Sequence, residues 1–104
     1  THAANPALLE RLPYDPVGDF AAITQFGSSA FVVMAAKGLG VTTLAALIER
    51  LRAEPGRHNY GWGAVPAHVA SALLVGLAGV DVAAVGYRGN QAAFPDLIND
   101  RLSF

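Results

Sequence analysis

The chain has 104 residues, of which 53% are hydrophobic and 14% are charged, and its formal net charge is −1. This apolar excess excludes an intrinsically disordered chain, and the near-zero charge argues against a nucleic-acid binding protein. The absence of cysteine excludes disulfides, thiolate zinc sites and cysteine nucleophiles. The length fits one domain with one hydrophobic core.

Both ends of the chain predict an internal piece of a longer protein. The chain begins at Thr1 without an initiator methionine or an apolar leader, and it ends in the apolar stretch Leu102–Phe104. A native terminus is more often polar. The low charged fraction agrees with this prediction, because surfaces that pack against a missing part would be apolar.

The first predicted elements are a short helix and two strands. Asn5 and Pro6 suit the start of a helix, which we expect to end at Leu12 because two prolines follow it closely. Apolar runs at residues 22–26 and 30–34 then predict two strands around a Gly-Ser-Ser turn.

The clearest helical pattern lies at residues 44–51. Its apolar positions recur at spacings of three and four residues, and they are Leu44, Leu47, Ile48 and Leu51. Either Thr42 or Thr43 is expected to cap this helix, and the Pro-Gly pair at 55–56 is expected to end it.

The second half of the chain alternates strands with helices. The pattern predicts a strand at 59–62, a helix at 67–78, a strand at 80–85, a helix at 91–99 and a strand beginning at 102. Alternation of this kind indicates an α/β fold with a mainly parallel sheet flanked by helices.

The helix predicted at 67–78 lies in a long uncharged run. A membrane span needs about 20 apolar residues, and this run is interrupted by Pro66, His68 and Ser71. We therefore expect a buried core helix that is more enclosed than the helix before it.

Two glycine-containing loops are the candidate binding site. Gly61–His68 and Gly86–Gln91 each connect a predicted strand to a predicted helix. In open α/β sheets ligands bind at this end of the strands, where free N–H groups of helix N-termini favour an anion such as a carboxylate. The signal is weak alone, because such turns are common: His68 is either a core side chain or a ligand contact, and Trp62 either fills the core or lines a cleft.

Enzymatic chemistry is not supported by the sequence. His68 and Ser71 lie on one predicted helix without a carboxylate at a useful spacing, so they do not form the arrangement that a hydrolase needs. The histidines at 2, 58 and 68 lack the spacing of a metal site. Neither a P-loop nor a Gly-x-Gly-x-x-Gly motif is present, and no cofactor is expected.

Several short motifs resemble one known family in order and approximate spacing over essentially all 104 residues. They are His2-Ala3-Ala4-Asn5-Pro6, Leu12-Pro13-Tyr14-Asp15-Pro16, Asp19-Phe20-Ala21, Pro55-Gly56, Asn59-Tyr60, His68-Val69-Ala70, Ala78-Gly79-Val80-Asp81 and Tyr87-Arg88-Gly89. The chain thus resembles the periplasmic solute receptors of tripartite tricarboxylate transporters, the Bug family.

This resemblance implies a periplasmic-binding-protein fold of the Venus-flytrap type, in which two α/β lobes close on a small ligand. Residues 1–20 would be the tail of the first lobe and a crossover, and residues 21–104 would be a truncated second lobe. The resemblance also implies a non-enzymatic, periplasmic receptor that binds a small organic acid and delivers it to membrane transporter subunits.

The resemblance implies that the family's ligand contacts carry over to three segments of this chain. Thr1 and His2 match a loop of the first lobe, while the loops at 61–68 and 87–92 match those of the second. The first of these two loops is about two residues shorter than in relatives, lacks a hydroxyl and contains Trp62, which favours a less polar, even aromatic, carboxylate. The candidate ligand-binding residues are Thr1, His2, Trp62, Gly63, Ala64, His68, Tyr87, Gly89, Asn90 and Gln91.

Two hypotheses of function remain open. The first is a solute-binding lobe for an organic acid, with partners in the membrane and none among nucleic acids. The second is a structural α/β fragment without ligand function, whose exposed apolar surface drives homodimerisation or strand exchange.

Overall fold

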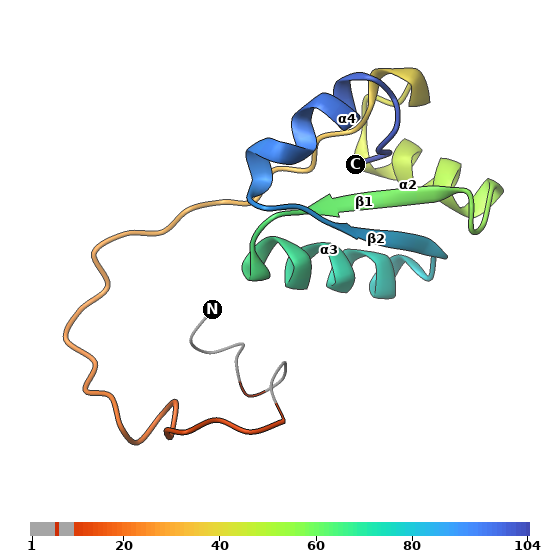
Figure 1. Cartoon of the computed structure of the whole chain (residues 1–104). Coiled ribbons are helices and arrows are strands. Elements are labelled where there is room, and N and C mark those ends of the chain that lie inside the picture. The colour runs from red at the N-terminus through yellow and green to blue at the C-terminus, as the bar shows by residue number, and fades with distance from the viewer. Residues whose placement is uncertain (1–5, 7–9) are drawn as a thin grey trace. The chain divides into compact units, whose positions relative to one another are not determined.

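The computed structural model describes residue 6 and residues 10–104. The chain divides into two units, residues 1–30 and residues 31–104. The second unit contains, in chain order, η2 (Lys37–Leu39), α2 (Leu44–Ala53), β1 (His58–Trp62), α3 (Val65–Ala78), β2 (Val82–Gly86), η3 (Asn90–Ala93) and α4 (Phe94–Ile98) (Figure 1).

The two strands form a parallel sheet. β1 pairs with β2 in a register that runs from His58 opposite Val82 to Trp62 opposite Gly86. The connection between them contains α3, as a parallel pair requires. Figure 1 shows α3 on one side of the two strands and α4 on the other. The prediction of a parallel α/β arrangement is confirmed for this unit.

The last residues of the chain lie along the second edge of β1. Gly61 N donates to Phe104 O over 2.8 Å, and Phe104 N donates to Asn59 O over 3.3 Å. This reciprocal pattern is that of a parallel ladder. The same residues at the end of the chain also bond to residue 36, since Ala36 N donates to Ser103 O over 2.9 Å. The residues at which a further strand was predicted to begin thus make ladder-type hydrogen bonds to β1, although they are not assigned as a strand.

Helix α2 follows the predicted pattern closely. The Thr43 side chain accepts a hydrogen bond from Ala46 N over 3.2 Å, so Thr43 is the N-cap. Leu47 and Leu51 are buried, whereas Leu44 at the start of the apolar stripe is 48% exposed. The helix ends at Ala53, and its C-cap Glu54 precedes the predicted Pro-Gly stop.

Helix α3 begins at Val65, two residues earlier than predicted, and ends at Ala78, with Gly79 as its C-cap in the left-handed region at a φ of 62°. The prediction that it is more enclosed than α2 is wrong, because Val69, Leu73 and Leu77 are 42%, 61% and 79% exposed. These residues recur every four positions and form one outward face, which the other elements of the second unit leave exposed. No helix in that part is both long and apolar enough to span a bilayer.

The core lies between β1 and the helices α2 and α3. Leu47, Leu51, Tyr60 and Phe104 form its buried cluster, and side chains of α3 pack against them. Arg52 of α2 fixes the two helices together, since its Nε and Nη2 donate to Ala78 O over 3.1 and 2.7 Å. A carbonyl at the end of α3 thus obtains a charged partner.

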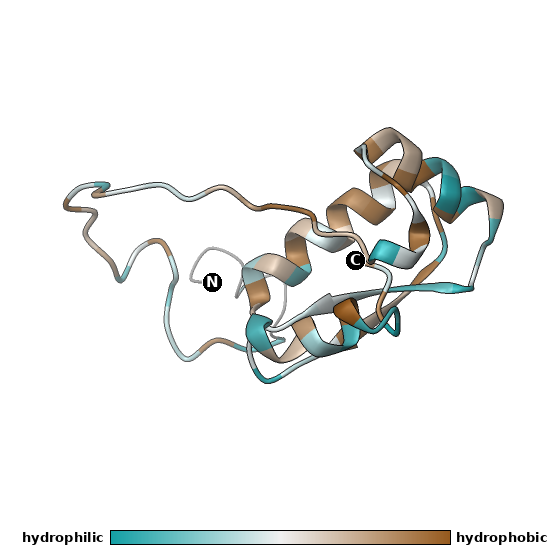
Figure 2. Ribbon diagram, turned by 90° about the horizontal axis from the view of Figure 1, so that it is seen from above, coloured by the Kyte–Doolittle hydropathy of each residue, from teal (hydrophilic) through white to brown (hydrophobic). Residues whose placement is uncertain are grey.

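The strands predicted at 22–26 and 30–34 are wrong, because residues 20–36 form no strand or helix. Ile23, Phe26 and Val32 are 95%, 103% and 78% exposed. Figure 2 shows hydrophobic residues along this extended stretch. A strand needs a neighbour for its N–H and C=O groups, and none of the described residues pairs with this segment as a ladder.

The first unit contains a tight turn at residues 15–19. Val17 N donates to Asp15 Oδ1 over 2.9 Å, and Asp15 N donates to Asp19 Oδ2 over 2.7 Å. Hydrogen bonds from the backbone of Gly18 and Val17 lower the pKa of the Asp15 carboxyl. Of the helix predicted at 5–12, residues 5 and 7–9 fall outside the described residues, and residues 10–12 are not helical.

Candidate functional site

Two loops meet at the carboxyl ends of β1 and β2. Because β1 and β2 are parallel, the loops that follow them leave the sheet at the same edge. Gly63 N donates to Asn90 Oδ1 over 3.0 Å, and Tyr87 N donates to Trp62 O over 2.8 Å. The loop from β1 to α3 and the loop from β2 to η3 are therefore bonded to each other through both backbone and side chain.

The contact between these loops is too close for any side chain at Gly63. A Cβ at Gly63 would lie 2.0 Å from the Gly89 carbonyl carbon and 2.2 Å from Asn90 N. Gly89 itself has a φ of 101°, which side chains rarely tolerate. The approach of the two loops thus explains Gly63, and the backbone conformation explains Gly89, while the Gly63 N–H is used by Asn90.

The N-terminus of α3 directly follows the first of these two loops. Its N-cap Ala64 has no side-chain hydrogen bond to the helix, and Pro66 in the first turn has no N–H. The hydrogen bond from His68 N to Ala64 O, over 3.1 Å, is the first bond of the helix. The N–H groups of Val65 and Ala67 lie before it and so have no partner within the helix. Two backbone donors and the positive end of the helix dipole are available here.

Three aromatic rings lie beside this helix end. The His68 imidazole stacks on the Trp62 indole, with ring centres 4.4 Å apart and planes inclined by 24°. Its Nδ1 lies 3.3 Å from the Tyr60 hydroxyl oxygen. Tyr60 and Trp62 are two residues apart on β1 and so share one face of the sheet. His68 is thereby held by both strand residues and covers part of the indole.

Tyr87 is anchored to α4 rather than left free in its loop. Its hydroxyl donates to Asp96 Oδ2 over 2.9 Å. Burial, together with this bond and the charge of Asp96, raises the pKa of the Tyr87 hydroxyl. Asp96 also lies 3.6 Å from Arg101 Nη1. The neighbouring Arg88 is exposed and is the one Lys, Arg, Asp or Glu in residues 61–68 and 86–91.

The structure brings most of the sequence-predicted site residues together. The two loops and the first turn of α3 contain Trp62, Gly63, Ala64, His68, Tyr87, Gly89 and Asn90. Gln91 is exposed in η3. Thr1 and His2 lie outside the described residues. The sequence prediction missed Tyr60 and Asp96, although the spacing of Tyr60 from Trp62 was a signal for a shared face.

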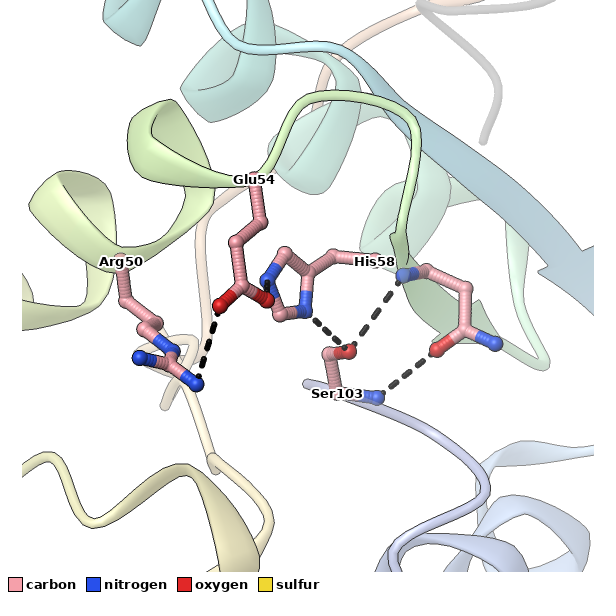
Figure 3. A network of polar contacts seen from close by, with 5 residues as sticks. Arg50, Glu54, His58 and Ser103 are labelled. Atoms are coloured by element: carbon pink, nitrogen blue, oxygen red, sulfur yellow. Dashed lines mark hydrogen bonds and ion pairs between the residues drawn. The ribbon is translucent and has the colours of Figure 1, made fainter.

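A second polar cluster lies at the opposite end of β1 (Figure 3). His58 is buried, its Nδ1 lies 3.1 Å from Ser103 Oγ, and its Nε2 lies 3.4 Å from Glu54 Oε2. Arg50 contacts the same carboxylate over 3.1 Å. The cluster ties the end of α2 to the last residues of the chain. Among the described residues, no group of three or more His, Cys, Asp or Glu side chains could hold a metal ion.

Comparison with known proteins supports one family. A search of curated proteins and a search of solved structures each found no match. The family TctC, described as the tripartite tricarboxylate transporter family receptor, matches residues 1–103. This match confirms the resemblance seen in the motifs, and it confirms the expectation of a transport receptor rather than an enzyme. The chain therefore belongs to the receptor family of the tripartite tricarboxylate transporters.

Proposed function

We propose that this chain binds a small organic acid as the second lobe of a two-lobed, periplasmic receptor. The receptor hands its ligand to the membrane subunits of a tripartite tricarboxylate transporter. Family membership supports the class of protein.

The observation that carries the proposal is the bonded pair of loops around Gly63 and Asn90. It places the open first turn of α3 beside the second loop, at the edge where ligands of parallel sheets bind. The carboxylate would accept hydrogen bonds from the N–H groups of Val65 and Ala67. The indole of Trp62 and the ring of His68 would form the adjoining wall.

The same loops favour a monocarboxylate with an apolar body over a tricarboxylate. Arg88 is the one Lys, Arg, Asp or Glu in the two loops, so a ligand with three charges would lack compensating cations. The segment 61–67 contains no hydroxyl side chain and contributes Trp62 and Pro66 instead. Such a surface suits an aromatic acid better than a small polar dicarboxylate.

Fluorescence of the single tryptophan, Trp62, tests this proposal. The chain is titrated with benzoate and, separately, with citrate. The proposal expects a saturable change in emission with benzoate and a weaker response to citrate. Saturable binding of citrate without any response to benzoate would overturn the ligand class, and no response to either acid would overturn the binding function.

Two proline substitutions test the role of the α3 N-terminus. Val65→Pro removes one N–H at the first helical position, where proline is accommodated after an extended residue such as Ala64. Loss of one hydrogen bond to a charged ligand should weaken benzoate binding by roughly tenfold or more. Leu44→Pro makes the same change at the first position of α2, which also follows an extended N-cap, and should leave binding unchanged.

A second candidate function is self-association without a ligand. The observation that favours it is the exposure of Ile23, Phe26 and Val32, which are 95%, 103% and 78% exposed. Apolar groups that extend into water favour contacts between copies. Sedimentation equilibrium and thermal unfolding together distinguish the two functions. A monomer whose melting temperature rises with benzoate supports the receptor, whereas a dimer whose melting temperature does not change with benzoate supports self-association.

A further inference from the structure

Tyr60 is a buried residue of β1 whose hydroxyl contacts His68 in the candidate site. Its side chain is 4% exposed and stacks on Phe104, with ring centres 5.7 Å apart. Its hydroxyl oxygen lies 3.3 Å from Nδ1 of His68 in the first turn of α3. This is the one side-chain hydrogen bond that the structure gives either residue within the described part of the chain.

The hydroxyl of Tyr60 acts as the donor in this bond. Burial raises the pKa of Tyr60, so the hydroxyl keeps its proton at neutral pH. A buried hydroxyl proton without an acceptor is costly, and His68 Nδ1 is the acceptor within reach. If Nδ1 carried the proton instead, the Tyr60 hydroxyl would have to accept, and its own proton would have no partner.

The direction of this bond determines where His68 carries its proton. A neutral imidazole has one donor and one acceptor nitrogen, so accepting at Nδ1 places the N–H at Nε2. Stacking on Trp62 at 4.4 Å holds the plane of the same ring. The position of the ring and the choice of donor nitrogen are therefore both determined by side chains of β1.

We propose that Tyr60 is a positioning residue that donates to Nδ1 of His68 and so keeps the imidazole proton at Nε2, ready to donate to the ligand. This inference rests on the proposed function, because the donor joins the open N–H groups of Val65 and Ala67 at the same helix end. Tyr60 itself touches no ligand. It acts through His68, and it links the candidate site to the core through Phe104.

Nitrogen-15 NMR of the histidine side chains tests the inference without any ligand. Spectra are recorded at about pH 8.5, where imidazole is ordinarily neutral, and His68→Gln assigns the His68 signals. The wild-type chain should show the Nε2–H form. Tyr60→Phe keeps the ring and removes the hydroxyl, and it should shift the tautomer ratio of His68 by roughly 2- to 10-fold, which corresponds to one hydrogen bond.

Tyr87→Phe is the matched control, because it removes a hydroxyl bonded to Asp96 and should leave the His68 tautomer unchanged. A wild-type chain in the Nδ1–H form overturns the inference, even if Tyr60→Phe does not fold. An unchanged tautomer ratio in a folded Tyr60→Phe also overturns it.

Benzoate titrations of the wild type, Tyr60→Phe, His68→Gln and the double variant test the consequence for binding. Tyr60→Phe should weaken benzoate binding by roughly 2- to 10-fold, and it should have no further effect when His68→Gln is already present. Equal effects of Tyr60→Phe in both backgrounds mean a purely structural role and overturn the inference. If the wild-type chain binds neither benzoate nor citrate, the proposed function fails, and the ligand-free tautomer still decides whether Tyr60 positions His68.

Discussion

Strand β1 and the segment 22–34 differ in a way that composition does not anticipate. β1 is His-Asn-Tyr-Gly-Trp, which is only moderately apolar, yet it makes backbone hydrogen bonds along both of its edges. The segment 22–34 is much more apolar, yet it forms no strand. β1 has β2 on one edge and Phe104 on the other, whereas the segment has no ladder partner among the described residues. Pairing, and not hydrophobicity, decides which extended residues become a sheet.

The two regions are expected to differ most in how much their apolar side chains contribute to the free energy of unfolding. Leu51→Ala creates a cavity at a residue that is 2% exposed and should lower the free energy of unfolding by about 2–5 kcal/mol. Ile23→Ala, at a residue that is 95% exposed, should change it by about 0.5 kcal/mol or less. Urea unfolding measures both. Similar losses in the two variants would mean that Ile23 is packed in solution.

Glycine substitutions sharpen the same comparison at the loops. Gly63→Ala forces a Cβ into the backbone of Gly89 and should cost about 1–3 kcal/mol of stability. Gly27→Ala, in the unpaired segment, meets nothing within 4 Å and should be close to neutral. The measurement is again urea unfolding, supplemented by the amide spectrum of Asn90. A neutral Gly63→Ala would show that the two loops are not in contact.

Threonine substitutions compare a capped helix with the unpaired chain. Thr43→Ala removes the hydrogen bond to Ala46 N and should cost about 1 kcal/mol. Thr24→Ala, which removes an exposed hydroxyl from the unpaired segment, should have a negligible effect. Thermal unfolding followed by circular dichroism checks this pair. Equal melting temperatures for Thr43→Ala and wild type would contradict the assigned cap.

Alkaline pH should lower the stability of the unit that contains Tyr60 and Tyr87, and this loss is absent at neutral pH. The segment 22–34 contains no tyrosine and should not contribute to it. Burial raises the pKa of Tyr60, and burial with Asp96 raises that of Tyr87. The unfolded chain releases these protons near about pH 10, before the folded chain does. Stability present below that pH is therefore lost as the pH rises through the folded pKa values. Melting temperatures from pH 8 to 11 should fall less steeply for Tyr60→Phe, and parallel curves would contradict the shift.

The fold of residues 44–104 was largely predictable because its signals are local. The stripe of α2, the Thr43 cap and the Gly79 stop each follow from residues within one helix. The exposure of Leu73 and Leu77 was not predictable, because it depends on which elements cover α3. The strands predicted at 22–26 and 30–34 failed for the same reason, since a ladder partner is a non-local property.

The candidate site was predictable in its location but not in its internal bonds. Glycine-rich turns after two strands indicated the edge of the sheet, and the loops meet there through Gly63 and Asn90. The close approach that requires Gly63, and the anchoring of Tyr87 by Asp96, depend on the packing of η3 and α4. The bond from Tyr60 to His68 depends on the position of α3 over β1 and is likewise non-local.

The central claim is that the loop pair and the first turn of α3 bind the carboxylate. An amide-resolved NMR titration of the chain with benzoate tests it most directly. The account predicts saturable shifts at the N–H groups of Val65, Ala67 and Asn90, with none at Phe26 and Val32. Shifts confined to residues 22–34, or no saturable shift at the three loop amides, would contradict it.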